Sequence, residues 1–108
     1  MMNRVLSNLG LAMRAGKIVT GDEAVLKAVR SAEAKLVLLA ADASPGTQKK
    51  FRDKCGTYQI PLAVAFSRDD LGASIGKDQR VVLAVIDKGF AEMISRQLGD
   101  HVGGEFID

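Results

Sequence analysis

The stretch AKLVLLAADASP, Ala34–Pro45, decides the fold. Its first part, Leu36–Ala41, is apolar at every position, which is typical of a strand covered on both faces. Ser44 and Pro45 then supply an N-cap residue and a first-turn proline, so a helix should begin directly afterwards. A doubly covered strand followed at once by a helix indicates an α/β domain.

Upstream of this stretch the same alternation is visible. Apolar residues recur at helical spacing from Val5 to Met13, and Gly16 stands where a C-cap would end that helix. Ile18 and Val19 form a minimal strand, and a second helix should begin at residue 20 or 21. The N-terminal third therefore contributes helix, strand and helix before the buried strand.

Downstream, two further apolar runs predict buried strands, Leu62–Phe66 and Val81–Ile86. Three helices separate or follow them, one after Pro45, a short one before the last strand and one at the end. The boundaries of these helices should be marked by Gly56, Ser67, Gly76 and Asp87. Helices on both faces of a sheet of about four strands make an α/β/α sandwich. The predicted core includes Val37, Leu39, Val64, Leu83 and Val85.

Length and composition limit the number of domains and the cellular compartment that the chain can have. At 108 residues the chain is one domain, which we place at residues 1–99. Residues 100–108 show no period and include two adjacent glycines, so a flexible tail is expected. No apolar run approaches the roughly 20 residues that span a bilayer, and a single cysteine, Cys55, suits a reducing compartment. These features predict a cytoplasmic protein that does not bind to or span a membrane.

Charge is unevenly distributed along the chain although the net charge is only +2. Residues 1–54 contain ten Lys/Arg and five Asp/Glu, whereas residues 55–108 contain five and eight. Such asymmetry favours an anionic partner, of which nucleic acid is the commonest, although solvated charged faces produce it too.

The motifs of catalysis and cofactor binding are absent from the sequence. GLAMRAGK, Gly10–Lys17, has one residue too many for a phosphate-binding loop and lacks the following hydroxyl. The dinucleotide motif GxGxxG does not occur. The only histidine, His101, falls in the expected tail, and Asp42 and Asp87 follow strands, where carboxylates usually cap turns and helices. We therefore expect that the protein is not an enzyme and that it binds neither a cofactor nor a metal ion.

The element order and three stretches of sequence resemble one known superfamily. The stretches are AGKIVTGDEAVLKAV (Ala15–Val29), AKLVLLAADASP (Ala34–Pro45) and DLGASIGKDQRVVLAVID (Asp70–Asp87). They resemble the ribosomal-type kink-turn RNA-binding proteins, which include archaeal and eukaryotic large-subunit ribosomal proteins and box C/D core proteins. Among its branches the chain is most similar to the bacterial YlxQ-like proteins. The resemblance implies a mixed sheet and RNA bound where the second helix begins.

Carried over residue by residue, the resemblance implies a set of RNA contacts. Gly21 and Lys27 match the family's glycine and lysine, and Gly76 with Lys77–Arg80 matches its second contact region. Three positions differ from the family pattern: Glu23 replaces Asn or Lys, Ala24 replaces Glu or Gln, and Gln79 replaces an aromatic residue or arginine. The differences imply weakened or altered kink-turn recognition. The expected contact residues are Lys17, Gly21, Asp22, Glu23, Lys27, Arg30, Gly76, Lys77, Gln79 and Arg80.

The Gly-Asp-Glu segment at residues 21–23 also has an explanation that involves no RNA. Thr20 and Glu23 have the spacing of a capping box, and Glu23 and Lys27 could form an i, i+4 ion pair. The positive end of the helix dipole would also stabilise the Asp22 carboxylate in the first turn. Two functions therefore stay open. The first is binding of structured RNA, ribosomal RNA among the candidates, together with ribosomal or RNP proteins. The alternative is a protein-interaction module that has lost specific RNA binding.

Overall fold

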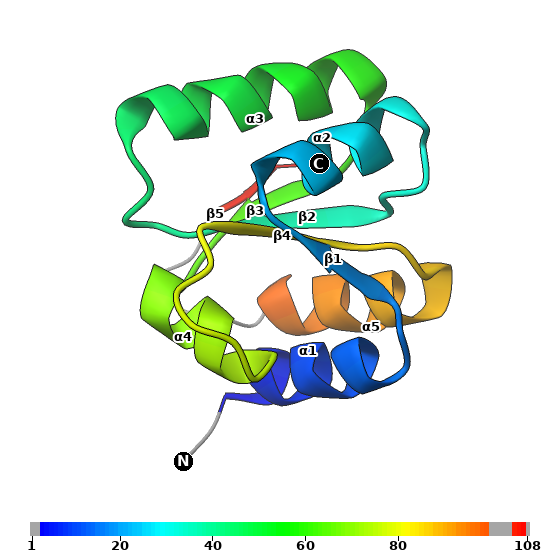
Figure 1. Ribbon diagram of the computed structural model, residues 1–108. Coiled ribbons are helices and arrows are strands. Elements are labelled where there is room, and N and C mark those ends of the chain that lie inside the picture. The colour runs from blue at the N-terminus through cyan, green and yellow to red at the C-terminus, as the bar shows by residue number, and fades with distance from the viewer. Residues whose placement is uncertain (1–2, 100–104, 108) are drawn as a thin grey trace.

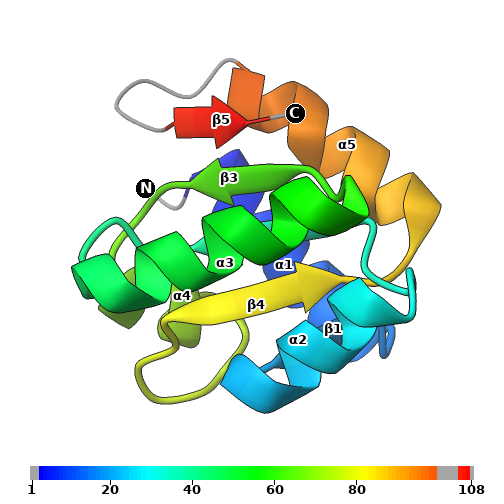
Figure 2. The ribbon, with the colours of Figure 1, turned by 90° about the horizontal axis from the view of Figure 1, so that it is seen from above.

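The computed structural model describes residues 3–99 and 105–107, in which five helices alternate with five strands (Figure 1). The elements are α1 Arg4–Arg14, β1 Ile18–Thr20, α2 Asp22–Arg30, β2 Leu36–Leu39, α3 Pro45–Tyr58, β3 Leu62–Val64, α4 Arg68–Ser74, β4 Val82–Val85, α5 Lys88–Gly99 and β5 Glu105–Ile107. Figures 1 and 2 show α2 and α3 on one face of the sheet and α1, α4 and α5 on the other. The predicted three-layer sandwich is confirmed.

The strands form one sheet in the order β1-β4-β2-β3-β5. β2 and β3 are parallel, whereas β1–β4, β2–β4 and β3–β5 are antiparallel. The sheet is therefore mixed, as the resemblance implied. Its parallel pair is joined through α3, because parallel neighbours need a crossover connection.

Two hydrophobic cores lie on the two faces of the sheet, and β2 contributes to both. Leu36 and Leu38 face the core shared with α1, α4 and α5, whereas Val37 and Leu39 face α2 and α3. This division follows from the two-residue alternation of side chains along a strand. The five residues predicted to be in the core, Val37, Leu39, Val64, Leu83 and Val85, are all buried.

The expected flexible tail needs a correction at its end. Glu105–Ile107 forms β5 and pairs with β3, which raises the strand count from about four to five. Three residues carry too weak a pattern to be distinguished from a tail, and only the open edge of β3 explains their pairing. Residues 100–104 and 108, including His101, lie outside the described residues.

The helix after Ser44 is longer than expected. Gly56 does not end it, because α3 continues to Tyr58 and Gln59 provides the left-handed C-cap residue at φ 58°. Cys55 is buried on the inner face of α3, and this burial raises the pKa of its thiol to about 11. The thiol is therefore protonated at neutral pH and packs as a small apolar side chain.

The strand directions bring several chain segments together at one end of the sheet. β1 ends where β4 begins, since Thr20 pairs with Leu83 and the Gly21 amide donates to the Val82 carbonyl at 3.4 Å. The loop between α4 and β4 begins beside α1, and its last residues, which lead into β4, lie beside the start of α2 (Figure 1). We call this end of the sheet the α2–loop edge, comprising residues 21–24 and 76–81.

Candidate functional site

The start of α2 differs from the start of every other helix in the described residues. Its N-cap residue is Gly21, at φ 97° and ψ 148°, which supplies no side-chain hydrogen bond. The other four helices are capped by side chains: Asn3, Ser44, Ser67 and Asp87 each accept a hydrogen bond from a first-turn amide. The first turn of α2 therefore has no side-chain cap from its N-cap residue, as suits a helix start that binds an anion.

Gly21 itself fits such a role. Its positive φ is a conformation that side chains rarely adopt, and no atom lies within 4 Å of the position that a Cβ would occupy. The backbone is thus open to solvent and able to be approached closely. The glycine is explained by its backbone conformation, whether or not a partner is bound.

The predicted capping box is wrong. Thr20 is the last residue of β1, and its hydroxyl donates to the Val82 carbonyl at 3.2 Å rather than accepting from α2. Within residues 3–99 and 105–107, Glu23 makes neither a capping hydrogen bond nor an ion pair with Lys27. Glu23 is therefore an exposed carboxylate with no structural function of the predicted kind.

Asp22 has a partner that the sequence did not reveal. Its carboxylate accepts from the Lys50 ammonium at 2.9 Å, and Lys50 also lies 5.3 Å from the centre of the Phe51 ring. Lys50 is on α3, 28 residues away along the chain. Spacing within one helix carries no signal of this contact, because only the packing of α2 against α3 creates it. Both side chains are partly exposed, so the pair adds little to stability.

The second half of the edge is the loop before β4, and it is held by the backbone. Lys77 donates from its amide to the Gly72 carbonyl at 2.9 Å, and Arg80 donates in the same way to Arg68 at 3.0 Å. A Cβ on Gly72 would lie 1.9 Å from the Asp78 carbonyl oxygen, so only glycine allows this close approach. No pattern in the sequence singled out Gly72.

Side chains of this loop are mostly solvent-exposed. Lys77 and Gln79 are exposed, whereas Arg80 is half-buried and its guanidinium donates to the carbonyls of Asp78 and Gln79. Arg80 is thus partly engaged in holding the loop. Lys77 is therefore the more exposed of the two cations of this loop.

The structure brings together only part of the predicted set. Gly21, Asp22 and Glu23 lie at the α2–loop edge with the four predicted loop residues, and Lys27 follows on an exposed face of α2. Lys17 lies at the opposite end of β1, where its carbonyl accepts from Ile86. Arg30 is the last residue of α2, far along the helix from Gly21. These two cations do not belong to the edge.

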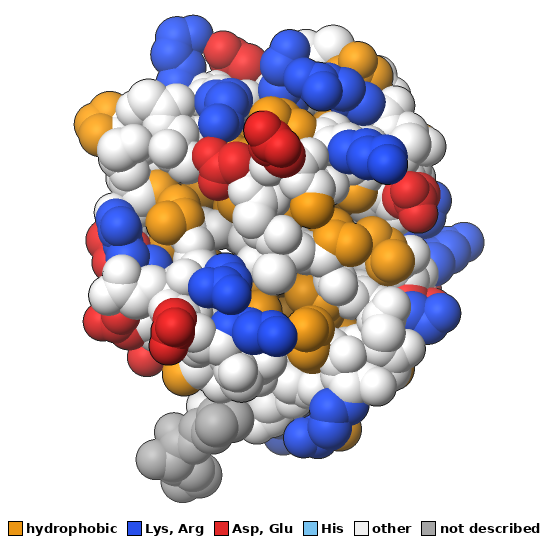
Figure 3. All heavy atoms as spheres, in the orientation of Figure 1, with side chains coloured by type: hydrophobic (Ala, Val, Ile, Leu, Met, Phe, Trp, Pro, Cys, Tyr) orange, Lys and Arg blue, Asp and Glu red, His pale blue; other side chains and the backbone are white. Residues whose placement is uncertain are grey.

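The front face of the molecule carries both signs of charge (Figure 3). Blue and red side chains alternate over α2 and α3, an uncharged band crosses the middle, and further blue side chains lie below it over the loop before β4. In the first turn of α2, the carboxylates of Asp22 and Glu23 partly neutralise the positive end of the helix dipole.

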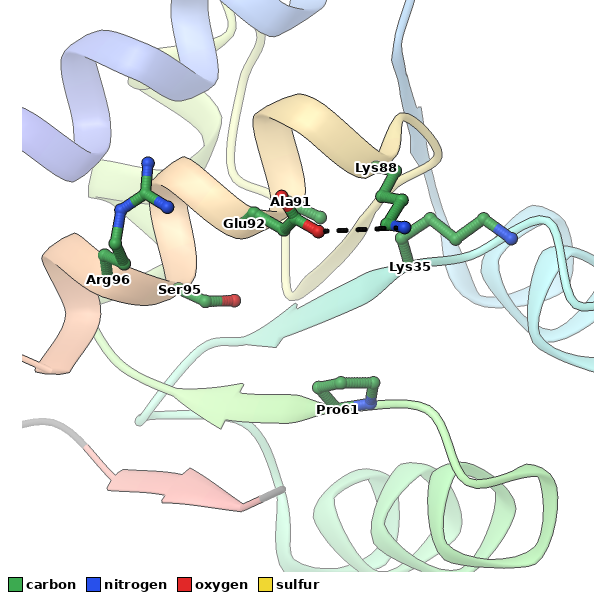
Figure 4. A pocket seen from close by; sticks show the side chains of 7 residues that line it. All are labelled: Lys35, Pro61, Lys88, Ala91, Glu92, Ser95 and Arg96. Carbon is green, nitrogen blue, oxygen red and sulfur yellow. Dashed lines mark ion pairs between the residues drawn. The ribbon is translucent and has the colours of Figure 1, made fainter.

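Another concavity lies at the opposite end of the sheet. Lys35, Pro61, Lys88 and Arg96 are among the residues that line a pocket of about 620 Å³ between α5 and the starts of β2 and β3 (Figure 4). Lys88 is 4.0 Å from Glu92 and Lys35 donates to the Ala32 carbonyl, so these ammonium groups already have partners. No sequence motif predicted this pocket.

Within the described part of the chain, no three His, Cys, Asp or Glu side chains gather in a way that could hold a metal ion. No helix among the described residues has the length and apolar character needed to cross a membrane. The feature that sets this sandwich apart among the described residues is the start of α2 without a side-chain cap.

The family follows from comparison with known proteins. The chain belongs to the Ribosomal protein L7Ae/L30e/S12e/Gadd45 family, whose model matches residues 3–95. It is 55% identical over 86 residues to RNA-binding protein YlxQ of Bacillus subtilis (strain 168), covering 80% of this chain and 86% of that protein. It is 37% identical over 95 residues to large ribosomal subunit protein eL30B of Schizosaccharomyces pombe, covering 82% and 78%. The resemblance drawn from the sequence is confirmed.

Two solved structures are similar to this chain. A protein with unknown function from Bacillus halodurans C superposes with a TM-score of 0.89 at 46% identity, covering 91% of this chain and 99% of that chain. The Giardia lamblia 15.5kD RNA binding protein superposes with a TM-score of 0.77 at 21% identity, covering 89% and 82%. At that identity the second likeness concerns the fold alone.

Proposed function

We propose that this chain is a non-enzymatic RNA-binding protein, associated with the ribosome or another RNP, that holds structured RNA at the α2–loop edge. The observation that carries the proposal is the uncapped start of α2 at Gly21, whose free amides and open backbone suit a phosphate. The names of the relatives support the same assignment, since they include RNA-binding and large-subunit ribosomal proteins.

Recognition by shape and phosphate contacts is favoured over base reading. Aromatic residues make up only 5% of the chain, which argues against a platform of stacked bases. Backbone amides of α2, Lys27 and Lys77 offer contacts to phosphates rather than to base edges. We propose that kink-turn recognition is weakened because Glu23 and Ala24 replace the residue types that read the paired purines in the family.

A second candidate function has its own observation. Asp22 and Glu23 place two carboxylates in the first turn of α2, where they repel phosphate. This arrangement favours a protein-interaction module that keeps the scaffold without specific RNA affinity. Asp22 is paired with Lys50, however, so one of the two charges is partly neutralised and the RNA-binding function stays the better supported.

Salt dependence separates the two candidates. If the edge neutralises about four phosphates, log affinity should fall with log salt concentration at a slope of about −3 to −4. Titration of the protein with a structured kink-turn RNA at several salt concentrations measures this slope. A flat response, or no binding at the lowest salt, would favour the protein-interaction module.

The double change Glu23→Asn with Ala24→Glu should tighten binding of a standard kink-turn RNA by about tenfold, or about 1.4 kcal/mol. The asparagine offers a donor and an acceptor to a base edge, and the glutamate accepts from the amino groups of the paired purines. The double change moves one carboxylate from residue 23 to residue 24, so the net charge of the first turn of α2 stays the same. The folded domain should tolerate the change, because Glu23 has no capping contact to lose.

Because the double change leaves the net charge of the chain unchanged, a gain in affinity cannot come from net charge. Glu33→Asn tests the loss of an exposed carboxylate away from the edge, since Glu33 lies beyond the other end of α2; it should leave the affinity nearly unchanged. Dissociation constants are compared at one fixed salt concentration. An unchanged affinity of the folded double variant would mean that residues 23 and 24 do not face the RNA.

A further inference from the structure

The pocket of about 620 Å³ between α5 and the starts of β2 and β3 has no part in the site described so far (Figure 4). We call it the α5 pocket, after the helix that supplies most of its lining. The lining residues that are buried or half-buried are Pro61, Ala91 and Ser95. The exposed ones are Lys35, Lys88, Glu92 and Arg96. The inner part of the pocket is therefore small and mostly apolar, and its outer part is charged.

The spacing of residues along α5 produces this lining. Ala91 and Ser95 are four residues apart, as are Lys88 and Glu92, so these side chains share one flank of the helix. Small side chains at residues 91 and 95 leave space between α5 and Pro61 (Figure 4). Because Ala91 also packs in the hydrophobic core, the pocket is formed by a helix that the core holds in place.

The charge of the α5 pocket is positive, since three of its four exposed residues are cations. Lys35 donates to the Ala32 carbonyl at 2.9 Å, a contact that does not neutralise its charge. Lys88 and Glu92 are 4.0 Å apart and their side chains are 83% and 57% exposed, so water weakens this pair. Among the described residues Arg96 has no ion-pair partner. The pocket therefore attracts an anionic group.

We propose that the α5 pocket binds an acidic segment of a partner protein, in which carboxylates flank an aliphatic side chain. The aliphatic side chain would lie against Pro61 and Ala91, and the carboxylates would pair with Lys88 and Arg96. Glu92 disfavours an RNA backbone, because phosphates follow one another along RNA without uncharged positions between them. A peptide can place an uncharged residue beside this carboxylate.

The α5 pocket and the α2–loop edge lie at opposite ends of β4. At the start of this strand the Val82 carbonyl accepts from the Gly21 amide, and at its end the Val85 carbonyl accepts from the Lys35 amide at 2.8 Å. A protein segment in the pocket therefore leaves the edge uncovered. The inference goes beyond the function proposed above and does not depend on it, since it adds a protein partner at a separate place.

The test uses two fluorescently labelled peptides of equal length. In the first, leucines are set among glutamates, and in the second, glutamines replace the glutamates. At low salt the acidic peptide should bind the wild-type protein at least about fivefold more tightly than the glutamine peptide. Lys88→Glu and Arg96→Glu should each weaken binding of the acidic peptide about fivefold, because each replaces an attraction by a repulsion. Amide shifts in the 15N-labelled protein should change at Ala91–Arg96 and not at Gly21–Ala24.

Lys49→Glu is the matched control. Lys49 is also an exposed lysine paired with a carboxylate four residues further along its helix, but it lies on α3, on the other face of the sheet (Figure 1). It makes the same change in net charge as Lys88→Glu and should leave the peptide affinity unchanged. An equal loss in Lys49→Glu, or no binding of the acidic peptide by the wild type, would overturn the site.

Ser95→Phe tests the pocket rather than its charge. The aromatic ring would occupy the space next to Pro61, so the acidic peptide should bind about fivefold more weakly although the net charge is unchanged. Melting temperatures check that each variant is folded. Full affinity of folded Ser95→Phe would mean that surface charge alone attracts the peptide. Single-stranded RNA that binds more tightly than the acidic peptide and is equally sensitive to Lys88→Glu would overturn the proposal in favour of phosphate.

Discussion

Gly21→Val should abolish binding of structured RNA, with a loss of at least about 100-fold, in the wild type and in the Glu23→Asn/Ala24→Glu background. The added side chain would fill the open space beside the backbone and keep a phosphate from the free amides of α2. The cost to the fold is one strained residue, about 1–3 kcal/mol, since φ is 97° at this position. Affinity at fixed salt and the melting temperature are both measured.

Gly16→Val is the control for strain. Gly16 also has a positive φ, 74°, and no atom lies within 4 Å of the position that its Cβ would occupy, but it lies before β1, at the other end of that strand. This variant should lose stability and keep RNA affinity. Equal losses of affinity in both variants would show that Gly21 acts through stability alone.

Gly72→Ala should destabilise the domain by about 3 kcal/mol or more, at the upper end of the cost of overpacking. The new methyl group would lie 1.9 Å from the Asp78 carbonyl oxygen, and a backbone atom cannot move aside without displacing the loop. The melting temperature should fall by more than about 10 °C for a domain of this size. RNA affinity should fall too, because the loop forms half of the α2–loop edge.

Gly56→Ala gives the matched comparison. Gly56 is inside α3 and a Cβ there meets no atom within 4 Å, so this change should stabilise the domain by about 0.5–1 kcal/mol through helix propensity. The melting temperatures of the two variants should therefore shift in opposite directions from that of the wild type. A Gly72→Ala protein as stable as the wild type would mean that the loop does not pack against α4 as described.

The fold was largely predictable because its strands are short continuous apolar runs. Leu36–Leu39 and Val82–Val85 are buried on both faces of the sheet, so each is an uninterrupted apolar run in the sequence. Polar residues that begin the next helix follow each run and make its end easy to recognise. β5 was not predictable, since three residues pair only because β3 leaves an edge open. Gln59 shows the other limit: a left-handed C-cap at a non-glycine residue leaves no mark in the sequence.

The position of the candidate site was proposed from the resemblance, and the contacts made within it were not predictable from the sequence. The resemblance directed attention to Gly21 and Gly76, and the strand register brings the segments around them together. The Asp22–Lys50 ion pair and the Gly72 contact depend on packing between elements, which no local pattern encodes. The capping box failed because the strand partner of Thr20 competes for its hydroxyl.

The central claim is that RNA is held at the α2–loop edge, and amide chemical shifts test it most directly. The 15N-labelled protein is titrated with a kink-turn RNA at low salt, and shifts are followed residue by residue. The largest changes should fall on the amides of Gly21–Ala24 and Gly76–Arg80, where the uncapped helix start meets the loop. Changes confined to the far end of the sheet, around Lys35, Ala91 and Arg96, would contradict the claim.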